Sequence, residues 1–232
     1  MSWLARLFTR RALPPDVESR LAAWRGLPAP DPAAIPRRWV VVDTETSGLD
    51  TARSNLIAIG AVAIENDAIV VAPCFEVVLR QDVASSRENI EIHGIGAAAQ
   101  AQGDDPVHAL LEFLEFARKD PLVAYHVAFD AAFLRRAIKA HLGMRFDCEW
   151  LDIAVLAALK FPDFARSRRG LDGWLARFGI EPEMRHNALA DAYATAQLFQ
   201  IAARRAARDG QRRLQDLLPV AGEHAAAMAR QQ

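Results

Sequence analysis

The stretch Trp39-Val-Val-Val-Asp43-Thr-Glu45-Thr-Ser-Gly-Leu-Asp50 decides the fold. It opens with a run of β-branched and aromatic residues, which is typical of a strand buried on both faces. Residues two apart on a strand share a face, so Asp43 and Glu45 should project together where the chain leaves the sheet. Two like charges at the rim of an apolar core repel each other and resist desolvation. The pair is therefore expected either to bind a cation or to end the strand at solvent in a polar turn.

The length and composition are those of a soluble globular protein with one domain of large size, or one domain with extensions. The 232 residues are 52% hydrophobic and 25% charged, which is enough to bury a substantial core. The net charge of -1 gives no global basic field, although local patches decide nucleic-acid binding. Cys74 and Cys148 lie far apart, which argues against a zinc ribbon or a disulfide framework. We expect both thiols in the core of a cytoplasmic protein, and no apolar run of about 18 residues predicts a transmembrane segment.

Three regions follow from the pattern along the chain. Residues 1–36 read as an N-terminal extension, with a helix over Asp16–Trp24 and a linker rich in Pro and Ala over Gly26–Pro36. Residues 37–208 should form the folded domain, and residues 209–232 a C-terminal tail. The folded part is thus expected to begin near Arg37.

Alternating strand and helix patterns predict the fold class. Two β-rich runs, Leu56–Glu65 and Ile69–Leu79, are separated by Asn66-Asp67, which is a hairpin signal. Two further strands are expected over Leu122–Tyr125 and Arg145–Glu149. Helices are predicted from Asp105, over Ala128–Leu142, Leu151–Leu159 and Leu171–Phe178, and from Ala188 to about Arg208. The chain should therefore be an α/β domain with a mixed sheet of about five strands, an antiparallel three-strand meander followed by parallel strands, flanked by helices.

Three more polar residues stand at element starts. Asp130 falls in the first turn of the helix after the fourth strand, where an acid is commonly stabilised by the helix dipole. With Asn187 as N-cap, Asp191 lies one turn into the last long helix while His186 remains on the approach. An anchored acid beside a mobile imidazole suits a metal ligand paired with a general base. The alternative is an exposed histidine before a capped helix.

These motifs resemble a known family. Asp43-Thr-Glu45, the segment His126–Asp130 and the segment His186–Asp191 resemble, in order and spacing, the three motifs of the DEDD exonuclease superfamily. The position four residues before the last acid is Asn187 rather than tyrosine, which identifies the histidine subclass (DEDDh). The resemblance covers about residues 37–203 and is greatest to the proofreading epsilon subunit of bacterial DNA polymerase III and its stand-alone relatives. It implies a ribonuclease H-like fold.

The resemblance implies a metal site and a reaction. It assigns two divalent ions, Mg²⁺ or Mn²⁺, to Asp43, Glu45, Asp130 and Asp191, and all-oxygen ligation selects such hard cations. Two ions about 4 Å apart activate the attacking water and stabilise the leaving 3′ oxygen. His186 would take the proton from that water. The product would be a nucleoside 5′-monophosphate released from a 3′ end.

Substrate contacts are also implied. The resemblance assigns them to Thr44, Thr46, Leu49, His93 and Phe129. Leu49 would wedge against a base, but core packing is an equal alternative for Leu49 and Phe129, and the alternative for His93 is a loop histidine. Val127 stands where relatives often carry asparagine, so a side-chain hydrogen bond near the site is missing. We interpret Asp152 as structural and outside the metal set.

Single-stranded or frayed DNA 3′ ends are the expected substrate. RNA or short oligoribonucleotides, processed by the same chemistry, and a non-catalytic nucleic-acid-binding scaffold are the alternatives, and the 2′-hydroxyl decides between the first two. The loop with Arg166, Arg168 and Arg169 would either contact substrate phosphates or remain solvated. Gln215–Pro219 faintly resembles a sliding-clamp-binding peptide, so a polymerase or clamp partner is considered. Trp3, Leu4, Leu7 and Phe8 have helical spacing, which suits docking on the domain or a partner, or on a membrane surface.

Overall fold

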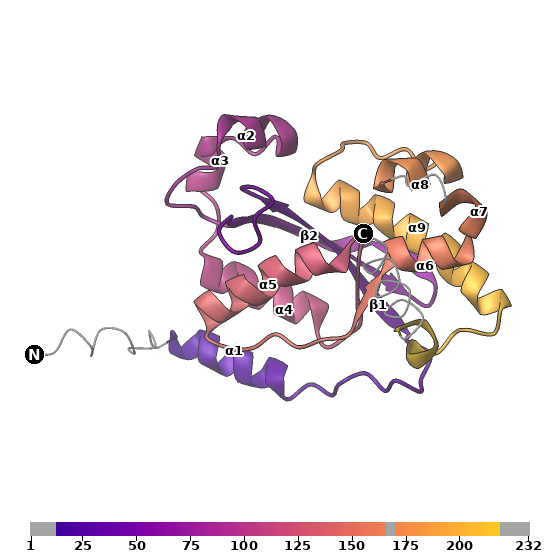
Figure 1. The fold of residues 1–232 in the computed structure, drawn as a ribbon. Coiled ribbons are helices and arrows are strands. Elements are labelled where there is room, and N and C mark those ends of the chain that lie inside the picture. Colours follow the sequence, from indigo (N-terminus) through magenta and orange to yellow (C-terminus); the bar gives the residue numbers. More distant parts are fainter. Residues whose placement is uncertain (1–12, 166–169, 219–232) are drawn as a thin grey trace, which may run out of the picture.

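A mixed five-stranded sheet runs through the centre of the protein, whose computed structural model describes residues 13–165 and 170–218 (Figure 1). Strands β1 (Arg38–Thr46), β2 (Leu56–Glu65) and β3 (Ala68–Val78) form an antiparallel meander. Strands β4 (Leu122–Ala124) and β5 (Trp150–Asp152) continue the sheet parallel to β1, in the order β3-β2-β1-β4-β5. The predicted α/β class and strand arrangement are confirmed.

The hairpin between β2 and β3 follows from its two turn residues. Asn66 and Asp67 both adopt left-handed backbone angles, with φ of 50° and 67°. Two consecutive residues of this kind match the twist of the flanking strands, and Asn and Asp tolerate the conformation better than most residues. The turn predicted from this dipeptide is therefore confirmed.

The position predicted for the fifth strand is wrong. The strand lies at Trp150–Asp152, where Trp150 pairs with Leu122, and not at Arg145–Glu149. The apolar signal of the predicted segment came from Phe146, which is buried from a loop and packs 6.3 Å from Phe113, ring centre to ring centre. Burial there fills the core beneath the sheet rather than extending the ladder. The next helix consequently starts at residue 153 rather than 151.

Helices cover both faces of the sheet (Figure 1). One face packs against α1 (Pro15–Arg25), α4 (Pro106–Ala117) and α5 (Val127–Leu142), and this apolar cluster, which includes Val40 and Val42, is called the first core. The other face packs against α6 (Ile153–Lys160), α8 (Leu171–Phe178) and α9 (Ala188–Arg208), and this cluster, which includes Val41, is called the second core. Shorter helices α2 (Arg87–His93), α3 (Ala97–Ala101) and α7 (Pro162–Ala165) lie in the connections.

Helix α1 belongs to the first core although it was predicted to lie in an extension. Its side chains Val17, Leu21 and Trp24 are buried there. The Arg20 guanidinium donates two hydrogen bonds to the Glu115 carboxylate on α4, at 2.8 Å and 2.6 Å. The boundary predicted near residue 37 thus separates elements that share one core.

The chain after α9 folds back on the linker that precedes β1. Residues 214–218 are helical, and the Gln215 backbone N–H donates to the Pro32 carbonyl at 2.8 Å. Leu217 is only 3% exposed and packs in the second core. The described part of the predicted clamp-binding peptide is therefore not displayed as a free ligand, and Pro219 lies outside the described residues.

The prediction that both cysteines are core thiols is wrong for Cys74. This residue is exposed together with the three residues before it on the edge strand β3. Cys148 is half-buried, and burial raises the pKa of its thiol to about 12. Within the described residues, no helix is long and apolar enough to cross a membrane. The predictions for residues 1–12 and for Arg166, Arg168 and Arg169 fall outside the described residues.

Candidate active site

Three acids meet at the end of β1. Carboxylate oxygens of Asp43, Glu45 and Asp191 lie within 4.8 Å of one another. The first two alternate along β1, as their spacing predicts. Asp191 is held in the first turn of α9, whose start is fixed by Asn187: its side-chain Oδ1 accepts from the Ala190 backbone N–H at 2.9 Å. The structure therefore brings together acids nearly 150 positions apart, in the spatial convergence that the motifs imply.

The fourth predicted acid approaches from the opposite face of the sheet. Asp130 is buried in the first turn of α5, and the Thr44 hydroxyl donates to its Oδ1 at 2.7 Å. The start of α5 is tied to Asp152, whose carboxylate accepts from the backbone N–H groups of His126 at 3.2 Å and Val127 at 3.1 Å. Asp152 also caps α6, so its structural interpretation is confirmed. Asp130 does not belong to the group of three whose oxygens lie within 4.8 Å.

Burial and mutual repulsion raise the pKa values of these acids. Burial raises the pKa of Asp43 well above its usual range, and repulsion from Asp130, Glu45 and Asp191 adds to the rise. Burial, then repulsion from Asp191 and Asp130, raises the pKa of Glu45 to about 8. The pKa of Asp130 rises to about 7, chiefly through burial. Asp43, Glu45 and Asp130 are thus costly to ionise, and the all-oxygen donor set that they form with Asp191 fits a hard divalent cation.

Among the residues that the structure describes, Arg185 brings a cationic side chain into contact with this cluster. The Arg185 Nη1 donates to Asp191 Oδ1, and its Nε donates to Asp172 Oδ1 on α8 at 2.6 Å. Its positive charge lowers the pKa values of Asp43 and Glu45, against the larger effects above. No local pattern predicts this role, because Arg185 lies in a turn and is held by Asp172, 13 residues earlier on α8.

His186 lies just before α9, next to the carboxylate of Asp191. It is exposed, with a left-handed backbone φ of 60°, and its backbone N–H donates to Asp191 Oδ2 at 2.9 Å. This hydrogen bond links the segment before α9 directly to Asp191, which is a candidate metal ligand. Both interpretations of the sequence fit this arrangement, the imidazole beside an anchored acid and the exposed histidine before a capped helix, so the general-base role stays a prediction.

Three of the predicted substrate residues, Thr46, Leu49 and Phe129, differ in how far they are exposed to solvent. Leu49 is 87% exposed, so the core-packing alternative does not apply to it. The Thr46 hydroxyl donates to the Gly48 carbonyl at 2.9 Å within the same loop. Phe129 is half-buried against the first core, 4.8 Å from the Phe133 ring. Of the three, Leu49 presents an unoccupied apolar surface.

His93 is buried rather than displayed. The Ile95 backbone N–H donates to its Nδ1 at 3.0 Å, so the neutral ring carries its proton on Nε2 and donates to the Ser85 hydroxyl oxygen, 3.3 Å away. Burial lowers the pKa of His93 and so favours this neutral form. The α2 helix that carries it is bound to the loop after β1, because the Asn89 side-chain amide donates to the Ser47 carbonyl.

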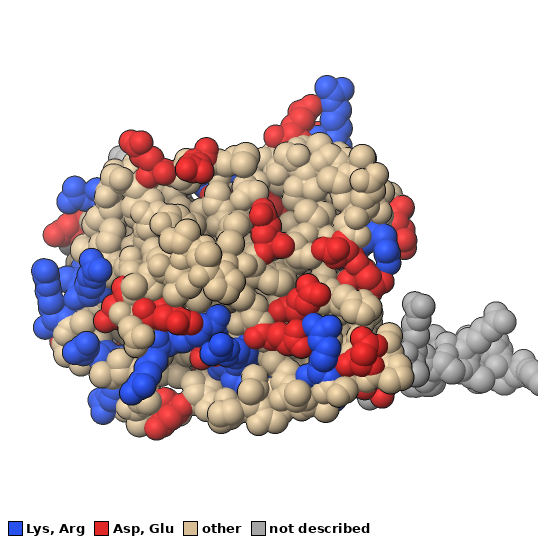
Figure 2. Space-filling model, turned by 180° about the vertical axis from the view of Figure 1, so that it is seen from behind, with Lys and Arg blue, Asp and Glu red and all other residues tan. Residues whose placement is uncertain are grey.

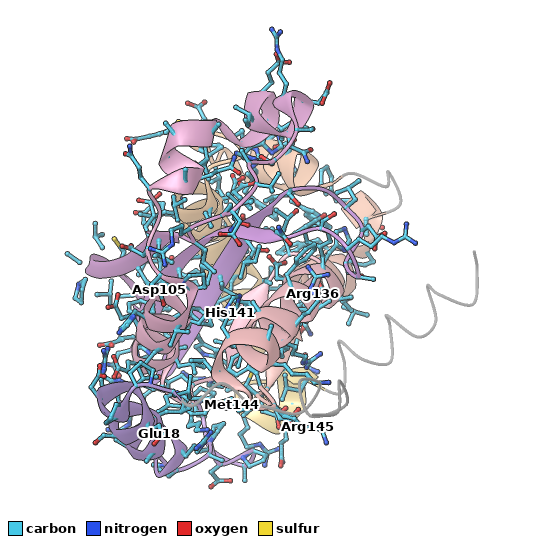
Figure 3. The ribbon with its side chains drawn as sticks, turned by 90° about the vertical axis from the view of Figure 1, so that its left-hand side faces the viewer. Glu18, Asp105, Arg136, His141, Met144 and Arg145 are labelled. Atoms are coloured by element: carbon cyan, nitrogen blue, oxygen red, sulfur yellow. The ribbon has the colours of Figure 1, made fainter. Side chains whose placement is uncertain are left out.

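Two other surface features lie apart from the acids. A groove beside α1, α4 and α5 is lined in part by Glu18, Asp105 and His141, which Figure 3 shows on one side of the molecule with Glu18 below the other two, and none of the predicted site residues lines it. On the face seen in Figure 2, basic side chains gather toward one end, with acidic ones among and beside them. That face is therefore not a continuous basic surface.

A family model described as exonuclease matches residues 40–199, which contain all three motifs. The chain belongs to this exonuclease family. The family recognised from the sequence is thereby confirmed. The exonuclease domain is 34% identical over 163 residues to a PolC-type DNA polymerase III of Thermotoga petrophila, covering 69% of this chain and 11% of the relative. It is 35% identical over 164 residues to a DNA polymerase III subunit epsilon-like protein of Rhodobacter capsulatus, covering 69% of this chain and 23% of the relative. The chain thus spans a minor part of these relatives.

Solved structures share the fold of this exonuclease. Exonuclease X in complex with 5′-overhanging duplex DNA superimposes with a TM-score of 0.62 and 20% identity, covering 79% of this chain and 99% of that one. The nuclease domain of 3′hExo, a DEDDh family member bound to rAMP, gives a TM-score of 0.62 and 15% identity, covering 76% and 94%. The predicted ribonuclease H-like fold is confirmed.

Proposed function

We propose that the protein is a metal-dependent 3′→5′ exonuclease that releases nucleoside 5′-monophosphates from single-stranded or frayed DNA ends. The observation that carries this proposal is the convergence of three carboxylates within 4.8 Å at the end of β1, on the chain of an exonuclease-family member. A cluster with pKa values raised by burial and repulsion is stable in its charged form only beside additional positive charge. Divalent cations held at the cluster would supply that charge and would stabilise the negative charge that develops during phosphodiester hydrolysis.

Asp43, Glu45, Asp130 and Asp191 would hold two Mg²⁺ or Mn²⁺ ions. Ions bound there would supply charge neutralisation at the phosphate and an activated water at neutral pH. The carboxylates are positioned from both faces of the sheet, Asp191 by the capped start of α9 and Asp130 by its bond from Thr44. This division suits a pair of ions better than one, because Asp130 lies outside the tightest group of oxygens.

His186 would act as the general base. It is exposed beside Asp191, and an imidazole titrates near neutral pH, so it can accept the proton of the attacking water. The left-handed backbone at this position turns the approach segment just before α9 begins. His186→Ala should lower turnover while leaving divalent-cation binding intact.

Five residues would define the pocket for the terminal nucleotide, in two ways. The exposed Leu49 would wedge against the base, with Thr46 and Phe129 beside it. Thr44 and His93 have their side-chain polar atoms engaged within the protein, at Asp130 and at Ser85 and Ile95. We therefore propose that these two shape the pocket through their partners more than by direct polar contact.

DNA is the preferred substrate in this proposal. The relatives named above are DNA polymerase III proteins, and one structural neighbour was solved with duplex DNA. RNA is the second candidate, because another neighbour holds rAMP. The four acids and the histidine are all present in the sequence, which argues against a non-catalytic scaffold. A polymerase partner and a cytoplasmic location extend the proposal from the same relatives and from the absence of paired cysteines.

The test compares strands of DNA and RNA labelled at either end, incubated with Mg²⁺ or Mn²⁺. A 5′-labelled DNA strand should shorten stepwise, and a 3′-labelled strand should release labelled mononucleotide at once. Faster cleavage of RNA would make the second candidate the better one. Release of mononucleotide from the 5′ end, or cleavage unaffected by Asp43→Ala, would overturn the proposal.

A further inference from the structure

We infer that Gly60 and Glu76 are positioning residues for the metal site, because they fix where α9 begins relative to β1. This inference rests on the proposed function, since its consequence is measured as divalent-cation binding and turnover. Neither residue is an acid of the cluster or a candidate contact for the substrate. Both act by placing Asp191 and His186, which lie at the start of α9.

The two residues stand in one row across the sheet with Asp43. In the β1–β2 ladder Asp43 pairs with Gly60, and in the β2–β3 ladder Gly60 pairs with Glu76. Paired residues in an antiparallel ladder project to the same face. That face is the one covered by α9, because Val41, two residues before Asp43, packs in the second core.

The first turn of α9 packs directly against Gly60, which has no side chain. A Cβ atom there would lie 2.2 Å from the Ala188 carbonyl carbon and 2.2 Å from the Leu189 backbone nitrogen. Both atoms are backbone, so no side-chain rotation relieves the overlap. The helix start would have to move until these contacts reach the 3.4 Å of ordinary packing. Glycine is therefore required by the closeness of the helix, at a position whose φ is not left-handed.

Glu76 holds the same helix start from the side. Its Oε1 accepts from the Asn187 side-chain amide at 3.2 Å, while Asn187 Oδ1 accepts from the Ala190 backbone N–H at 2.9 Å. The amide group thus connects β3 to the N-cap of α9. Without Glu76, Asn187 can still cap the helix, but the cap loses its tie to the sheet.

Through this row of paired residues, the register of the sheet determines where the groups of the active site lie. Asp43 contributes a carboxylate at one position of the row, Gly60 sets the distance of α9 from the sheet, and Glu76 anchors the N-cap residue of α9, Asn187. A displacement of α9 at this point would move Asp191 relative to Asp43. Misplacement by about 1 Å of a group in a catalytic site costs about 100-fold in rate.

The first experiment is Gly60→Ala, with Gly103→Ala as the matched control. A Cβ at Gly103 would lie 2.6 Å from the Val78 carbonyl oxygen and 2.8 Å from the Leu79 carbonyl carbon, and none of its three nearest atoms belongs to α9. Both variants introduce one methyl group against backbone and should lose stability. Only Gly60→Ala should weaken Mn²⁺ binding, by about 10-fold or more in calorimetric titration, and lower kcat about 100-fold with little change in KM.

The second experiment needs no change in the core. Glu76 is exposed, so Glu76→Ala should fold, and it should weaken Mn²⁺ binding by about 3-fold, as expected for one solvent-accessible hydrogen bond. Glu76→Gln keeps an oxygen that accepts from Asn187 and should restore wild-type binding. A purely electrostatic effect of Glu76 would instead make the two variants alike.

The outcomes separate this inference from the proposed function. If the wild-type protein neither binds Mn²⁺ nor releases mononucleotides, the proposed function fails. If the wild type does both, and Gly60→Ala binds Mn²⁺ and turns over like Gly103→Ala, the positioning role of Gly60 is overturned. Should Gly60→Ala fail to fold, equal Mn²⁺ affinity of Glu76→Ala and the wild type would overturn the inference.

Discussion

The crowded carboxylates should make the metal-free protein lose stability as pH rises, and Glu45→Gln should remove much of that loss. The pKa of Glu45 rises from 4.5 to about 8 in the folded protein, through burial and repulsion from Asp191 and Asp130. Between these pH values the folded protein holds a proton that the unfolded chain has released. Stability therefore falls with rising pH across this window and levels off above about pH 8.

The magnitude follows from the same two pKa values. Between pH 5 and pH 8, the loss through Glu45 amounts to about 3 to 4 kcal/mol of unfolding free energy. For a domain of this size that corresponds to roughly 10 °C in Tm. In Glu45→Gln the side chain cannot ionise, so this part of the pH dependence should vanish. At pH 8 and without metal, the variant should be the more stable protein.

Urea denaturation in EDTA at pH 5 and pH 8, followed by circular dichroism, measures this difference. Glu181→Gln is the matched control, because it makes the same substitution at an exposed glutamate. Adding Mn²⁺ at pH 8 should stabilise the wild type far more than Glu45→Gln, since the ion binds the charged form. If wild type and Glu45→Gln lose stability equally from pH 5 to pH 8, crowding at Glu45 is not the cause and the electrostatic reasoning fails.

Three further predictions test single contacts. Thr44→Val removes the hydroxyl that donates to Asp130 and should weaken Mn²⁺ binding about 10-fold in calorimetry, with Thr44→Ser near wild type; equal binding by the two variants would contradict this. Arg185→Gln should lower metal-free stability at pH 8 by about 1 to 3 kcal/mol in urea denaturation, and saturating Mn²⁺ should cancel the difference; a loss that persists with Mn²⁺ would count against it. Leu21→Ala should cost about 2 to 5 kcal/mol of unfolding free energy without changing kcat below the melting transition, because α1 packs in the first core; a loss below 1 kcal/mol would show that α1 is dispensable.

Local sequence signals predicted the parts of the fold that local chemistry determines. The run before Asp43 had to be a buried strand, and the Asn66-Asp67 turn had to reverse the chain. Asn187 was recognisable as an N-cap because its side chain bonds three residues ahead. These features depend on residues that are close in sequence, and all of them are present in the structure.

Features that depend on residues far away in the sequence could not be predicted from local patterns. Phe146 resembled a strand residue, but its burial is set by rings on α1 and α4. Helix α1 resembled part of an extension, because the surface that covers it lies about a hundred positions later on α4. Arg185 gave no signal for a similar reason, since its partner Asp172 belongs to another helix.

The residues that make up the candidate site could be predicted from the sequence, but the residues that hold them in position could not. Spacing and residue type singled out the acids and His186, whereas their relative positions depend on the ladder register that puts Asp43 beside Gly60. A glycine in an apolar strand carries no sign of what rests on it. The hydroxyl of Thr44 was likewise assigned to substrate, although in the structure it donates to Asp130.

The most direct measurement of the central claim is a crystal structure with Mn²⁺ and a nucleoside 5′-monophosphate, using anomalous scattering to locate the metal. We predict two anomalous peaks about 4 Å apart, enclosed by Asp43, Glu45, Asp130 and Asp191, with the nucleotide phosphate at the peaks. Arg185 should then no longer donate to the oxygen of Asp191 that faces the metal. Absence of any peak at these four carboxylates under saturating Mn²⁺ would contradict the account.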